Sequence, residues 1–175
     1  MTDLDLARRV YEAAHITGTF LLRSGVTSNE YFDKYLFESD PALLLDIALG
    51  LVDLVPAEID ALAGLELGGI PIATMLSQIT QLPARFVRKQ AKDYGTCQIA
   101  EGGIIEGQRL LIVEDVVTSG GAIIDAAAEL RAQGAVLGPV VCVIDRESGG
   151  AKNLSDIGLT LHPLFTMTQL KAGSA

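Results

Sequence analysis

Two adjacent carboxylates followed by a glycine turn are the residues of this chain best suited to bind a ligand. Glu114 and Asp115 end an apolar run, and residues 118–121, Thr-Ser-Gly-Gly, follow after a two-residue spacer. Ionised carboxylates only accept hydrogen bonds, so this pair suits sugar hydroxyls or Mg²⁺. The hydroxyls and amides of the turn suit a phosphate, because glycine permits close approach and the next helix begins with positive partial charge. The pattern predicts a site for a ribose and its phosphate.

The elements around this turn must position it. Residues 110–113 are branched and apolar, which predicts a buried strand, and residues 122–133 are typical of a helix. Ligands of open α/β sheets bind beyond the carboxyl ends of the strands. Neighbouring strand residues point to opposite faces, so we expect the chain to leave strand geometry at the acids, letting both face one ligand. The alternative is an ordinary capped turn beside solvated acids. The turn alone would favour that alternative, whereas the full ordered string favours the site.

The remaining pattern alternates strands with helices. After an extended segment that ends at Phe37, this alternation predicts an α/β fold with a parallel central sheet and helices on both faces. We expect helices over residues 3–15, 41–55, 71–79 and 122–133, and strands over residues 61–66, 84–87, 109–113, 140–144 and 159–164.

The composition is typical of a compact cytoplasmic enzyme. With 175 residues, 49% of them hydrophobic, the chain can bury the core of one α/β domain with a small appendage. Its net charge of −9 argues against a general nucleic-acid binder, and no apolar run approaches membrane-spanning length. The N-terminus resembles an amphipathic helix more than a secretory signal. We interpret Cys97 and Cys142 as free thiols in a reducing compartment.

One short stretch of this acidic chain is basic. Arg85, Arg88, Lys89 and Lys92 lie within eight residues, and a glycine-punctuated segment follows to residue 103. Such a segment between two strands is expected to be mobile, and a mobile basic loop beside a phosphate site suits a lid over a pyrophosphate. The alternative is a solvated basic loop.

The acid pair and its turn resemble the phosphoribosyl pyrophosphate (PRPP) signature of type I phosphoribosyltransferases. Three further segments narrow the resemblance: residues 20–33, with Phe-Leu-Leu-Arg-Ser-Gly and Tyr-Phe-Asp, residues 88–95, Arg-Lys-Gln-Ala-Lys-Asp-Tyr-Gly, and residues 143–146, Val-Ile-Asp-Arg. In this order they are similar to the orotate phosphoribosyltransferase family, over about Phe20 to Arg146.

The resemblance implies a fold, a reaction and partners. It implies the type I phosphoribosyltransferase fold, with an N-terminal hood over residues 1–38, a core over residues 39–175 and a mobile loop at about 88–104. The reaction would join orotate to PRPP, giving orotidine 5′-monophosphate and pyrophosphate in pyrimidine biosynthesis. Mg²⁺ would be held mainly through PRPP, with Asp115 the candidate for direct contact. A homodimer is implied, with the loop acting across the interface, and neither nucleic acid nor a membrane is an expected partner.

The resemblance also assigns residues. Charge separation between the sugar and the departing pyrophosphate calls for electrostatic stabilisation more than for a strong base. The catalytic candidates are Lys92, Arg88, Lys89 and Asp115. The candidates for PRPP binding are Arg23, Arg88, Lys89, Lys92, Tyr94, Glu114, Asp115, Val116, Val117, Thr118, Ser119, Gly120, Gly121 and Ala122. Those for orotate are Tyr31, Phe32, Thr118 and Arg146. Arg146 suits the orotate carboxylate, because a guanidinium can bind it bidentately, although it could instead pair with Asp145 or Glu147.

Two positions depart from the family pattern. Tyr94 stands where many members have histidine, and Gly68 where members often have lysine. We hypothesise that Lys92 carries more of the charge stabilisation as a result, so that Lys92→Ala would lower turnover by more than a few-fold. The departures leave open a PRPP-sensing regulator without catalysis, which the acid pair and basic loop oppose. A transferase for another base, such as a purine, is also open, and Arg146 with the aromatic hood opposes it.

Overall fold

A six-stranded sheet forms the centre of the computed structural model, which describes residues 3–21, 25–90 and 98–173. Its strand order is β5-β4-β3-β6-β7-β8, and every neighbouring pair is parallel except β4 with β5. The strands are β3 (Ala61–Leu65), β4 (Ala84–Val87), β5 (Ala100–Glu101), β6 (Arg109–Val117), β7 (Val136–Asp145) and β8 (Leu161–Thr166). The predicted α/β class with a mostly parallel sheet is confirmed.

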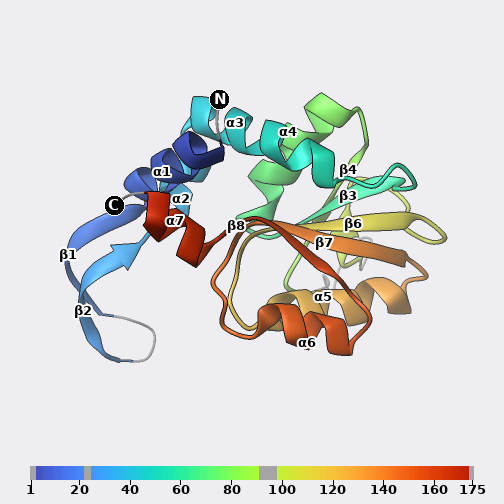
Figure 1. Ribbon diagram of the computed structural model, residues 1–175. Helices are drawn as coiled ribbons and strands as arrows, with labels where there is room; N and C mark the ends of the chain where they lie inside the picture. The colour runs from blue at the N-terminus through green and yellow to red at the C-terminus, as the bar shows by residue number, and fades with distance from the viewer. Residues whose placement is uncertain (1–2, 22–24, 91–97, 174–175) are drawn as a thin grey trace.

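Helices cover both faces of this sheet (Figure 1). On one face lie α3 (Pro41–Leu51), the 3₁₀ turn Val52–Leu54 and α4 (Gly69–Thr80), and on the other α5 (Gly121–Ala132) and α6 (Gly150–Asp156). The core accordingly divides into two apolar clusters, one centred on Ile47, Leu62 and Leu76 and the other on Ile112 and Ile123. Burial on both faces explains why β3 is apolar throughout.

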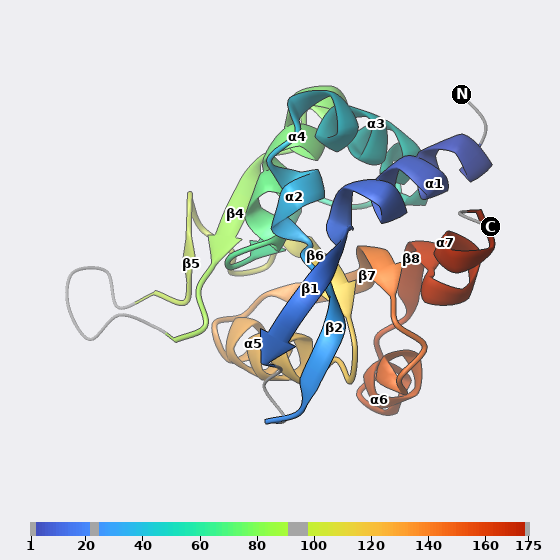
Figure 2. The same ribbon diagram turned by 90° about the vertical axis from the view of Figure 1, so that its left-hand side faces the viewer.

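The N-terminal segment continues this core and then leaves it. Helix α1 (Asp3–Ala14) packs against α7 (Met167–Gly173), and its apolar face joins the first core cluster. The antiparallel strands β1 (His15–Leu21) and β2 (Thr27–Phe32) form a two-stranded ribbon (Figure 2) that projects from the body (Figure 1), and α2 (Tyr35–Glu38) leads back into it. The division of the chain at residue 38 stays a prediction.

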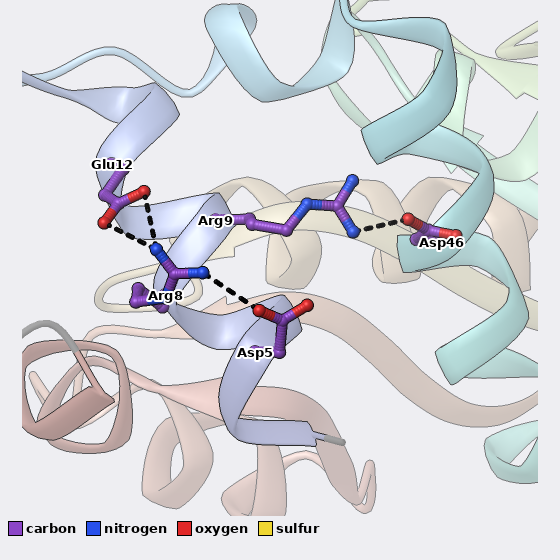
Figure 3. Close-up of polar contacts among 5 residues, drawn as sticks. All are labelled: Asp5, Arg8, Arg9, Glu12 and Asp46. Atoms are coloured by element: carbon purple, nitrogen blue, oxygen red, sulfur yellow. Dashed lines mark hydrogen bonds and ion pairs between the residues drawn. The ribbon is translucent and has the colours of Figure 1, made fainter. Parts of the chain in front are cut away.

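A partly buried ion pair attaches α1 to the body. Arg9 Nη1 lies 2.7 Å from Asp46 Oδ2 of α3 (Figure 3). Arg8, on the exposed side of the same helix, bridges Asp5 and Glu12 one turn away on either side. The first contact joins two elements that are distant in sequence, whereas the second supports only the helix that contains it.

The structure corrects the prediction for the acid pair. The chain does not leave strand geometry at Glu114 and Asp115, because β6 continues to Val117. The cause is β7, which runs alongside to Asp145 and extends the parallel ladder to the pair Val117–Asp145. The short elements α2, β5, α6 and α7 were also missed, since each has too few residues to show a period.

The sheet topology identifies where a ligand should bind. Strand β3 has β4 on one side and β6 on the other, so the chain changes direction across the sheet between them. Ligands of open α/β sheets bind at such a switch point, beyond the carboxyl ends of the strands. In the part of the chain that the structure describes, no helix is long and apolar enough to cross a membrane.

Candidate functional site

A cavity of about 500 Å³ opens at this switch point. It contains many of the predicted PRPP-binding residues, from Arg88 and Lys89 to Glu114 and the whole turn after β6. Its walls are Leu65, Glu66, Val87, Arg88, Lys89, Glu114, Val116, Val117, Thr118, Ser119, Gly120, Gly121, Ala122, Ile123, Asp125 and Ala126. Three other predicted residues, Arg23, Lys92 and Tyr94, lie outside the described residues.

The turn after β6 and the start of α5 form one wall of this cavity. Gly120 has φ of 77°, a left-handed conformation that suits glycine, and Ile124 N donates to Gly120 O at 3.0 Å as α5 begins. Because glycine has no side chain to cap the helix, the first amides of α5 receive no capping bond from position 120. These amides and the exposed hydroxyls of Thr118 and Ser119 form a suitable site for a phosphate.

Helix α6 supports the turn from behind, a role that sequence reasoning missed. Asn153 Nδ2 donates to Ser119 O at 3.0 Å. Gly150 lies so close that a Cβ atom there would be 2.5 Å from Thr118 O. The only signal for this contact was the glycine pair 149–150 after β7, which predicts a turn without showing what packs against it.

Two cations reach the cavity from the end of β4. Arg88 Nε is buried and has no hydrogen-bond partner among the described residues, and Arg88 also lines the cavity. A buried donor without a partner costs about 1–3 kcal/mol, so an anion in the cavity would be stabilised there. The backbone of the next residue is held by Glu66, whose Oε1 accepts from Lys89 N at 2.6 Å.

The two acids do not share the cavity in this conformation. Glu114 lines it, whereas Asp115 is fully buried and absent from its walls. Asp115 lies instead beside Lys34, whose Nζ is 2.5 Å from Asp115 Oδ2. Burial raises the pKa of Glu114 well above its usual range. Burial alone would raise the pKa of Asp115 too, but hydrogen bonds with Glu114 and Lys34 outweigh it and the pKa is lowered.

A second cavity, of about 330 Å³, lies between the ribbon and the body. It brings together three of the four predicted orotate residues, Tyr31, Phe32 and Arg146, while Thr118 lines the first cavity. Sequence reasoning missed the other walls, because they come from α1, β1, β2 and α7 and no local motif marks them. The full lining is Tyr11, His15, Ser28, Glu30, Tyr31, Phe32, Arg146, Met167 and Lys171.

The local bonding of Arg146 fits a ligand contact better than a structural ion pair. Among the described residues, neither Asp145 nor Glu147 forms an ion pair with it: Asp145 Oδ1 accepts from Glu147 N, and Glu147 Oε2 accepts from Thr168 N. Arg146 N donates to Val117 O at 2.9 Å, which ties this residue to the strand that carries the acids. The two cavities are therefore joined through one backbone hydrogen bond.

The comparisons agree with this arrangement. The phosphoribosyl transferase domain model matches residues 42–159. An orotate phosphoribosyltransferase from Nocardioides sp. is 52% identical over 170 residues, which cover 97% of this chain and 95% of that protein. Crystal structures of the Mycobacterium tuberculosis orotate phosphoribosyltransferase superpose with TM-scores of 0.84, in complex with Fe(III) dicitrate, and 0.81, in complex with PRPP. They are 28% and 25% identical, and the matches cover 96% and 97% of this chain and 98% of each of those chains. The chain therefore belongs to the phosphoribosyltransferase family and, within it, to the orotate phosphoribosyltransferases.

Proposed function

We propose that this protein transfers the 5-phosphoribosyl group of PRPP to orotate, giving orotidine 5′-monophosphate and pyrophosphate. The observation that carries the proposal is the junction of two complementary cavities. One has a phosphate-binding turn and an acid, and the other has a guanidinium beside aromatic rings, with Arg146 N bonded to Val117 O between them. The PRPP complex of the M. tuberculosis relative and the names of the close relatives support the same substrates.

The first cavity would hold PRPP. The amides and hydroxyls of residues 118–122 would bind its 5′-phosphate, and Glu114 is the acid that faces the ribose hydroxyls. Arg88 and Lys89 would receive the pyrophosphate, because the Arg88 Nε donor is buried without a partner among the described residues. Contributions from Arg23, Lys92 and Tyr94 stay predictions, as does a ribose contact from Asp115.

The second cavity would hold orotate. The Arg146 guanidinium can bind the orotate carboxylate bidentately, and Tyr31 and Phe32 can flank the pyrimidine ring. As the bond between the ribose and pyrophosphate breaks, positive charge develops on the sugar and negative charge on the leaving group. The cations at the end of β4 would stabilise the leaving group, which is the main electrostatic demand of this reaction.

Magnesium, dimerisation and a cytoplasmic location belong to the proposal. Within the described residues no group of three or more acids, histidines or cysteines could hold a metal ion. Mg²⁺ commonly binds through one or two carboxylates together with substrate phosphates, and Glu114 in the cavity fits that pattern. We further propose a homodimer in which loop 88–104 acts on the partner's site.

The decisive test is orotate consumption, followed by ultraviolet absorbance, with PRPP and Mg²⁺ present and then with each omitted. We expect orotate to disappear only when PRPP is present and pyrophosphate to be released in equal amount, with a strong dependence on Mg²⁺. Reaction of a purine base in place of orotate would identify a different transferase. PRPP binding without turnover of any base would identify a regulator.

A further inference from the structure

Gly68 leaves a space that the Asp115 carboxylate occupies. Its φ of −71° and ψ of −29° are ordinary helical values, so the backbone does not require glycine there. Glycine is required instead by the close packing around it. A Cβ atom at this position would overlap the Asp115 carboxylate and would lie 2.7 Å from Glu38 Oε1. Any side chain at position 68 would therefore displace Asp115 from its present place.

Lys34 reaches the same carboxylate from the N-terminal segment. It precedes α2, and its Nζ lies 2.5 Å from Asp115 Oδ2. The Asp115 side chain is fully buried, whereas 34% of the Lys34 side chain is exposed. Breaking a buried pair by removing one partner is strongly destabilising, because it leaves an uncompensated charge. Among the described residues, Lys34 is thus the cation that pairs with this carboxylate and stabilises its ionised form.

This contact also connects the two cavities. Lys34 follows Phe32 of the second cavity by two residues, and Asp115 follows Glu114 of the first cavity directly. Asp115 Oδ1 in turn accepts from Val116 N at 2.5 Å, so the position of its carboxylate is coupled to the strand that leads into the turn. A shift of Lys34 would change how the second cavity faces the first.

We propose that Lys34 is a positioning residue of the transferase: its ammonium pairs with the Asp115 carboxylate, which fills the space that Gly68 leaves open, and so holds the ring-binding residues of β2 in a fixed position relative to the acid pair. The inference rests on the proposed function, since the relative position of the two cavities matters only if their ligands react with each other. Small displacements of bound reactants can reduce turnover by about 100-fold. Loss of the Lys34 contact should therefore lower kcat more than it weakens the binding of either ligand.

The test compares Lys34→Met with the parent protein in kcat, in the KM of each substrate and in thermal unfolding. We expect kcat to fall at least about tenfold, with PRPP affinity within about threefold of the parent. Lys152→Met is the matched control, because Lys152 also pairs with an aspartate at 2.7 Å but on the exposed surface of α6, and it should leave kcat unchanged.

A substitution at Gly68 tests the same contact from the other side. Gly68→Ala should also lower kcat, because even a Cβ atom there would overlap the Asp115 carboxylate and displace it from Lys34. If Lys34→Met does not fold, Lys34→Gln removes the charge while keeping a donor and takes its place.

Failure has distinct forms. Unchanged kcat in Lys34→Met or in Gly68→Ala, in a protein whose parent is active, would overturn the inference and leave the proposed function standing. An inactive parent would overturn both.

Discussion

The two cavities are built in different ways. The first takes its proposed phosphate-binding part from one continuous string, residues 118–122, and much of that part is main chain at the start of α5. The second is assembled from side chains of α1, β1, β2, α7 and the end of β7. Main-chain sites leave a mark in the local sequence because they need glycine and a helix start. Side-chain sites built from distant segments leave none until the topology is known.

The difference also predicts how each cavity responds to mutation. Amides at a helix start are held by the fold, so a substitution there acts by moving the backbone, and partial function survives small movements. A guanidinium that binds a carboxylate is a single group, and truncating it removes the whole interaction and leaves the ligand charge unpaired. Substitutions in the second cavity should therefore have the larger and more ligand-specific effects.

The largest effect is expected for Arg146→Ala. Arg146 is exposed, and orotate in the second cavity would cover it. Removing one partner of a charged pair that binding buries costs about 2–5 kcal/mol, so the KM for orotate should rise about 100-fold or more. PRPP affinity should stay within about threefold, because Arg146 is absent from the first cavity. Steady-state kinetics with each substrate varied, together with PRPP calorimetry, measure both quantities.

Arg131→Ala is the control for this prediction. Arg131 is an exposed arginine at the end of α5, and its side chain donates to a backbone carbonyl away from both cavities. Equal losses for both substrates would contradict the division into two cavities.

A smaller effect is expected for Gly120→Ala at the phosphate turn. A left-handed conformation costs an alanine about 1–2 kcal/mol, and relief of that strain would move the turn, weakening PRPP binding about tenfold. Gly158 has the same φ of 77° with open space around it, in a turn outside both cavities. Gly158→Ala should therefore lose similar stability with unchanged PRPP affinity. If the two variants weakened PRPP binding equally, loss of stability alone would explain the result.

The sequence predicted the features that depend on local residues, and missed those that depend on contacts between distant segments. The sheet, its main helices and the phosphate turn were predicted because hydrophobic period and glycine placement are local signals. The support from Asn153, the walls around Arg146 and the contact between Lys34 and Asp115 were not, because each joins segments far apart in sequence. The error at the acid pair has the same origin: the length of β6 is set by its neighbour β7 rather than by its own residues.

The smallest expected effect concerns Glu38, which lies beside the contact that connects the two regions. Burial and the charge of Asp115 raise the pKa of Glu38 from 4.5 to about 9. Between these values the folded protein keeps a proton that the unfolded chain releases, so the free energy of unfolding falls as the pH rises. A glutamine at this position has no proton to release, so Glu38→Gln should gain stability relative to the parent as the pH rises from about 6 to about 9. A relative gain of about 1 kcal/mol would correspond to roughly 2–4 °C in Tm for a domain of this size.

Thermal unfolding at several pH values measures this gain, with Glu129→Gln on the exposed face of α5 as the control that should follow the parent. Parallel curves for Glu38→Gln and the parent would mean that Glu38 is ionised in the folded protein. Asp115 and Glu38 would then both be charged beside Lys34, and their mutual repulsion would oppose the contact between the two cavities. The alternative is a protonated Glu38 beside one ion pair, between Lys34 and Asp115. The pH dependence of Tm thus reports which of the two arrangements joins the regions.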